Sequence, residues 1–249
     1  MKKEYLYRGM FYLTGLLILA LGITLNTKTG LGVSPIISVS YSISTIWNLN
    51  FGNMTLVLYA LFVLIEMVLH VIRNQKYLKR EGAVLAHANK VNLKLVLLMD
   101  VLQFPLSLVF TRFLNIFSDI LPDLRDAYGD SFAGSFAGRV LFLVIAIILT
   151  GAGAAMSLNM RVIPNPGDGI VQAIADCAGK GVGFTKNCFD VLNITITITV
   201  GLVFAGKLIG VGIGTVLAVI GVGRVIAVFN HFCMEKMDVL AGMEQEEIS

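Results

Sequence analysis

Four charged side chains fall within segments that are otherwise apolar, and they are Glu66, Asp100, Asp190 and Arg224. A charge inside a membrane is costly, so it usually faces a partner or a polar cavity. The carboxylates are therefore candidates for binding a proton or a substrate charge. Arg224 is a candidate partner for Glu66, Asp100 or Asp168, or for an anionic substrate. The alternatives are that Arg224 reaches the headgroups with its long side chain, and that Asp100 and Asp190 reach cytoplasmic water.

Two Gly/Pro-rich breaks offer a second kind of site. One is "IPNPGDGI", residues 163–170, and the other lies in "GLGVSPIISVSYSISTIW", which follows the first apolar run. Proline is favoured at the first position of a helix, and Ser or Asn just before it. Ser34-Pro35 and Asn165-Pro166 are therefore predicted to begin short helices, with Asp168 in the first turn of the second one.

Polar residues recur every four positions after each break, at Ser34, Ser38 and Ser42 and at Asp168, Gln172 and Asp176. If these faces line a cavity, the predicted substrate-binding residues are Ser34, Pro35, Ser38, Asn165, Pro166, Gly167, Asp168 and Gln172. Alternatively, the short helices lie at the membrane surface with their polar faces in water, or the segments are ordinary loops.

The elements that must position these residues are membrane-spanning helices. Of the 249 residues, 56% are hydrophobic and only 14% are charged, against about 25% charged in an average soluble domain. Apolar runs of roughly 20 residues, long enough to cross a bilayer, recur along the chain. The predicted spans are Tyr7–Asn26, Met54–Ile72, Leu93–Phe117, Arg139–Met160, Asn187–Ala205 and Val211–Cys233. The predicted fold is an all-α membrane protein.

The distribution of loop charges predicts the topology. Basic residues collect before the first span and between the second and third, and acidic residues collect between the third and fourth. Because Lys and Arg favour cytoplasmic loops, both termini are predicted to be cytoplasmic. The basic loop contains Arg73, Lys76, Lys79, Arg80, Lys90 and Lys94, and the acidic loop contains Asp119, Asp123, Asp126 and Asp130. Attraction of anionic lipid or nucleic acid is the alternative reading of the basic loop.

An internal repeat is indicated by the two breaks. Aligning Pro35 with Pro166 also aligns Gly22 with Gly153. Since each unit holds three spans, the second would enter the membrane from the opposite side, as in many secondary transporters. The predicted organisation is an N-terminal three-helix repeat (1–117), an acidic extracellular loop (118–138), a C-terminal three-helix repeat (139–233) and a cytoplasmic tail (234–249).

Other residue types predict packing rather than chemistry. Gly210 with Gly214, and Gly151 with Ala155, are small-residue pairs that let helices approach closely. Pro105 is expected to kink the third span. The three cysteines and three histidines show no metal-ligand spacing, so neither a metal site nor a cofactor is predicted.

The elements "GLGVSP", "NPGDG" and "GIGTVLAVIGVGRVIAVF" resemble those of the YczE/YyaS/YitT group of bacterial membrane proteins. The resemblance rests on Pro166-Gly167-Asp168 and Gly214-Thr215, whereas Ile37 stands where an aspartate of the first copy is expected. That departure argues against a role requiring paired acids. The group is of poorly defined function, so the resemblance implies a multi-pass protein of the bacterial cytoplasmic membrane rather than an activity.

The predicted function is a small-molecule transporter or permease with a site between the two repeats. The alternative is a substrate-binding or accessory membrane subunit. Without a Walker motif in this chain, any ATPase would be a separate partner. The chain has no H-E-x-x-H or G-x-S-x-G motif, so an intramembrane enzyme is a remote alternative and no catalytic residues are predicted. The expected partners are the lipid bilayer, a small-molecule substrate, and a second copy or a partner subunit, without nucleic acid.

Overall fold

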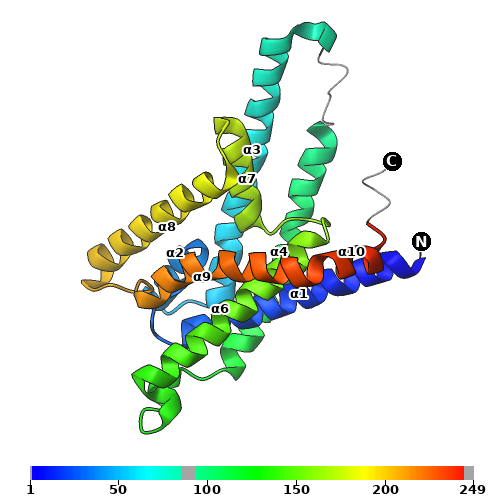
Figure 1. Cartoon of the computed structure of the whole chain (residues 1–249). Coiled ribbons are helices and arrows are strands. Elements are labelled where there is room, and N and C mark those ends of the chain that lie inside the picture. Colours follow the sequence, from blue (N-terminus) through cyan, green and yellow to red (C-terminus); the bar gives the residue numbers. More distant parts are fainter. Residues whose placement is uncertain (1, 86–92, 244–249) are drawn as a thin grey trace.

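The computed structural model describes residues 2–85 and 93–243, and the side chains of residues 3–76 and 93–243. All regular elements in these ranges are helices (Figure 1). They are α1 (Lys2–Lys28), α2 (Pro35–Ile46), α3 (Phe51–Leu85), α4 (Leu93–Ile120), α5 (Leu124–Ala127), η1 (Phe132–Gly134), α6 (Phe136–Asn159), α7 (Pro166–Ala178), α8 (Val182–Ala205), α9 (Ile213–Phe229), η2 (Asn230–Met234) and α10 (Glu235–Ala241). Lys79, Arg80 and Lys90 of the basic loop lie outside the described side chains.

Six helices of the described chain are long and apolar enough to cross a membrane, which confirms the predicted all-α membrane fold. They contain α1, α3, α4, α6, α8 and α9. Large apolar side chains such as Val203 and Phe204 stand exposed on the outside of these helices. In a bilayer, lipid covers such surfaces, so their exposure is the pattern expected of lipid-facing helices.

Helices α1 and α6 pack along one another, in the lower part of Figure 1. A Cβ atom on Gly22 would come within 2.5 Å of the backbone nitrogen of Thr150, and one on Gly15 within 2.7 Å of that of Ser157. Gly153 faces Leu19 just as closely. Glycine is required at this contact because the two backbones leave no room for a side chain.

The predicted small-residue pairs pack in a different way. Gly151 of α6 lies against Val225 of α9, and Ala155 is fully buried. Gly210, in contrast, precedes α9 and has a φ of 78°, so its role is a left-handed turn rather than a helix contact. Gly214 packs on the first break, where its N–H donates to the carbonyl of Leu31 at 2.7 Å. Helix α4 continues through Pro105 without interruption.

Helix α2 begins beside the middle of the spanning helix α8 rather than at the end of that helix. Its Ser38 hydroxyl lies 2.7 Å from that of Thr197 in α8, and its Ser40 hydroxyl lies 3.1 Å from that of Thr55 in α3. Of the predicted polar face, Ser38 and Ser42 are buried and Ser34 is half-buried, and the neighbouring Ser40 is buried as well. The face predicted to be polar is therefore inside the protein, and the surface-helix alternative does not describe α2.

Helix α7 is arranged in the same way against α3. After α6 ends, an extended segment carries the chain back inward, where the Tyr12 hydroxyl donates to the carbonyl of Ile163 at 3.0 Å. Helix α7 then runs alongside α3 in the same direction. Gly169 lies against Glu66 near the middle of the span, and Asp176, near the end of α7, forms an ion pair with Arg73 at 2.7 Å.

The segment predicted as a tail is partly helical. Residues Glu235–Ala241 form α10, which packs against the start of α1 and buries Met237 and Ala241. In Figure 1, α10 lies beside the start of α1. A helix as short as α10 has too few apolar positions to show a clear periodicity in the sequence. It is stabilised by packing against α1, which the sequence does not reveal.

Candidate functional site

The start of α7 has the local structure that its sequence predicts. Pro166 occupies the first helical position, and the Asn165 side chain accepts a hydrogen bond from the N–H of Gly167 at 3.0 Å. Asp168 lies in the first turn. Helix α2 also begins at its proline, but Ser34 makes no capping hydrogen bond through its side chain. Pro35 itself removes one N–H that would need a cap.

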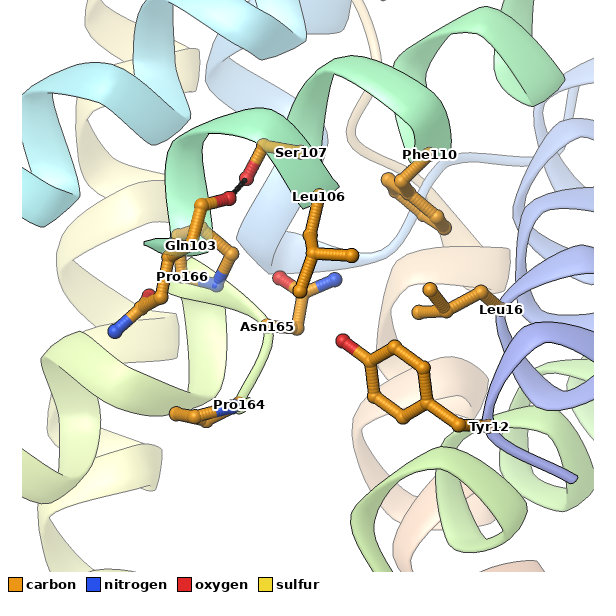
Figure 2. Close-up of a pocket in the computed structure, with 9 residues that line it drawn as sticks. All are labelled: Tyr12, Leu16, Gln103, Leu106, Ser107, Phe110, Pro164, Asn165 and Pro166. Carbon is orange, nitrogen blue, oxygen red and sulfur yellow. Dashed lines mark hydrogen bonds between the residues drawn. The ribbon is translucent and has the colours of Figure 1, made fainter. Parts of the chain in front are cut away.

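A small cavity lies at the second break, between α1 and α4 (Figure 2). Its volume is about 10 Å³, which is room for roughly one water molecule. The lining residues are Tyr12, Leu16, Gln103, Leu106, Ser107, Phe110, Pro164, Asn165 and Pro166. Two predicted site residues, Asn165 and Pro166, therefore border a cavity, and the side chains opposite them come from both α1 and α4.

Glu66 and Asp100, on neighbouring helices α3 and α4, belong to one buried cluster. The amide nitrogen of Gln103 donates to Glu66 Oε1 at 3.0 Å, and His70 Nδ1 lies 2.8 Å from Asp100 Oδ2. Glu66, Asp100 and Gln103 are each no more than 3% exposed. The alternative prediction was that Asp100 reaches cytoplasmic water. Its side chain is instead buried between α3 and α4.

His70 and Gln103 were missed by the sequence analysis, although a signal was present. Glu66 and His70 are four residues apart, and Asp100 and Gln103 are three apart. On a helix such pairs share a face. Nothing in the sequence alone shows that these two faces belong to adjacent helices and meet.

The cluster touches the second break through α7. A Cβ atom on Gly169 would lie 2.6 Å from Glu66 Oε2 and 2.8 Å from Oε1. Gln103 belongs to both features, since it lines the cavity beside Asn165 and hydrogen-bonds Glu66. The break and the buried carboxylates therefore form one continuous polar region.

Asp168 faces a second group of charges. Burial raises the pKa of the Asp168 carboxyl above its ordinary value, and the positive charge of Lys186 in α8 opposes that rise. Lys186 also lies 3.9 Å from Asp190, which is 5% exposed. Asp168 and Asp190 thus share the influence of one lysine.

The remaining predicted residues lie elsewhere. Gln172 is exposed on α7 and donates to Asp176 at 2.9 Å. Arg224 is exposed on α9, as expected if its side chain reaches the headgroups rather than pairing with a buried carboxylate. Ser38 contacts α8 rather than the cavity at the second break. The structure brings together Asn165, Pro166 and Glu66, but leaves Gln172 and Arg224 outside.

Six apolar spanning helices and two short helices that begin beside the middle of other helices define a multi-pass α-helical membrane protein. A family model matches residues 6–231, nearly the whole chain. The chain belongs to that family, the family of unknown function DUF6198. No curated protein and no solved structure matches the chain.

Proposed function

We propose that this protein is a small-molecule transporter whose site lies where α7 begins, between the N-terminal half (residues 1–117) and the C-terminal half (residues 139–233). One observation carries the proposal: each short helix packs against a spanning helix of the other half, α2 against α8 and α7 against α3. Reciprocal packing of this kind is expected of two inverted repeats, in which broken helices meet near the membrane midplane.

The polar residues support a site at the second break. The N–H groups at the start of a helix attract anionic groups, and Asn165, Asp168 and Glu66 lie at or beside this start. Helices α1 and α4 complete its surroundings. If the two halves tilt against each other, the same residues become open to one side of the membrane and then to the other.

The orientation follows from the loop charges. We propose that both termini are cytoplasmic and that the acidic segment 118–138 is extracellular. The resemblance to the YczE/YyaS/YitT group supports the bacterial cytoplasmic membrane as the location. The proposal includes assembly of the protein with a second copy of itself or with a partner subunit.

The test is a ligand screen followed by flux. Purified protein is screened by thermal shift against metabolite classes, because a ligand that binds the folded state raises the melting temperature. Each hit is then loaded into liposomes containing the protein, and its release is timed. We expect flux that Asp168→Asn abolishes and that Asp119→Asn, the same change at an exposed residue, leaves unchanged. Tight binding without flux would contradict a transporter and favour a binding subunit.

A further inference from the structure

The buried cluster of Glu66, His70 and Asp100 has the composition of a metal site. One donor atom from each of the three side chains lies within 4.8 Å of the others. Ligands of a divalent metal held at about 2.1 Å lie between about 3.0 and 4.2 Å apart, at right angles or opposite one another. The three donors therefore have to draw closer to bind one ion, and side-chain rotations can bring them together.

The pair formed by His70 and Asp100 already has the spacing of two ligands. Nδ1 of His70 and Oδ2 of Asp100 are 2.8 Å apart. That distance suits a hydrogen bond, and it is also close to that of two neighbouring donors on one ion. Glu66 supplies the third donor beside this pair.

Two buried acceptors point to a missing positive charge. Oε2 of Glu66 and Oε1 of Gln103 have no hydrogen-bond partner among the described residues. Glu66 is 3% exposed and Gln103 is 1% exposed. A buried carboxylate oxygen without a donor is unfavourable unless a cation or a proton satisfies it. Arg73, the nearest arginine along α3, is engaged by Asp176 at 2.7 Å.

We infer that Glu66, His70 and Asp100 bind a divalent first-row transition-metal ion, with Gln103 orienting Glu66. Carboxylates alone would suit Mg²⁺ or Ca²⁺, whereas the imidazole favours ions such as Mn²⁺ and Zn²⁺. His70 is 13% exposed at its side chain, so it is the least buried of the three proposed ligands. The inference goes beyond the proposed transport, since an ion held here has a structural or a coupling role whatever the substrate is.

The experiment measures binding directly. The full-length protein, purified in detergent and stripped with a chelator, is titrated with Mn²⁺ and followed by electron paramagnetic resonance of the free ion, with Zn²⁺ as competitor. We expect one saturable Mn²⁺ per chain, displaced by Zn²⁺. Asp100→Asn and Glu66→Gln are expected to weaken binding by at least about tenfold. Asp190→Asn, the same change at another buried carboxylate outside the cluster, retains wild-type affinity.

A folding defect is separated from a ligand effect by a third variant. His70→Gln lies at the more exposed edge of the cluster, so it keeps the test informative if a buried variant does not fold. The inference is overturned if the wild-type protein binds neither ion saturably, if Asp100→Asn and His70→Gln bind like wild type, or if Asp190→Asn weakens binding equally. Flux in liposomes is a separate measurement, so loss of metal binding with intact flux contradicts this inference alone.

Discussion

Gly169 of α7 lies directly against the carboxylate of Glu66 in α3, with no room for a methyl group between them. The contact joins the second break to the buried cluster, and it explains why a glycine follows Asp168. A larger residue would push the carboxylate away from Gln103, its hydrogen-bond donor. The position of Glu66 is therefore set from two helices, by Gln103 of α4 and by the bare backbone of α7.

Replacing this glycine is expected to disturb the cluster. In Gly169→Ala the new Cβ displaces the carboxylate and weakens its hydrogen bond with Gln103, so we expect a loss of about 1–3 kcal/mol in the free energy of unfolding. Thermal unfolding in detergent measures it. The control is Gly223→Ala in α9, where a Cβ atom meets nothing within 4 Å, and a small stabilisation is expected there. Equal effects of the two changes would rule out a special role for the contact.

The ionised carboxylate of Asp168 is expected to lower the stability of the folded protein, although the proposed transport requires it. Because its pKa is raised in the folded protein, ionisation opposes folding, and the penalty grows as the pH rises from the unfolded pKa to the folded one. Asp168→Asn should therefore raise the melting temperature at pH 8 and change it little near pH 4. Melting curves of both proteins across this range test the sign. A variant that is less stable than wild type at pH 8 would contradict the prediction.

The hydroxyl contact between Ser38 and Thr197 is expected to stabilise the packing of α2 on α8. A double-mutant cycle with Ser38→Ala and Thr197→Val should give a coupling of about 1 kcal/mol, the usual value for a buried hydrogen bond. Thr195 is a matched control on the same helix. Its hydroxyl makes the same intrahelical bond at 2.8 Å but is exposed, so Ser38→Ala and Thr195→Val should show no coupling.

The contact of α1 with α6 is expected to tolerate no side chain at Gly22. Its Cβ would meet both the backbone nitrogen and the hydroxyl of Thr150, and neither can move without separating the helices. We expect Gly22→Ala to destabilise the protein by about 1–3 kcal/mol. Gly9→Ala, in the same helix but with nothing within 4 Å, should leave the melting temperature nearly unchanged. Similar melting temperatures for the two variants would refute the argument.

Local features of the fold could be predicted from the sequence. Long apolar runs determine the spans because only helices satisfy the backbone in lipid, and Asn165-Pro166 determines the start of α7 because cap and proline act within one turn. The π-helical segment η2 and the helix α10 after α9 have no comparable local signal.

Features that join distant segments could not be predicted. The spacing of the serines in α2 is equally consistent with a face at the membrane surface and with a buried face. The contact of Ser38 with Thr197 of α8 shows that the face is buried. Glu66 and Asp100 were singled out separately, but their meeting depends on how α3 packs on α4. For Arg224 the sequence left open a reach to the headgroups and pairing with a carboxylate, and its exposed position on α9 is the one that the first alternative requires.

The packing of α10 against α1 has a consequence for biosynthesis. Helix α10 is synthesised after α1 and all the described helices between them, yet Met237 and Ala241 of α10 belong to the same apolar core as Tyr12 and Leu16 of α1. That end of the core is therefore completed only after residue 241 has been synthesised.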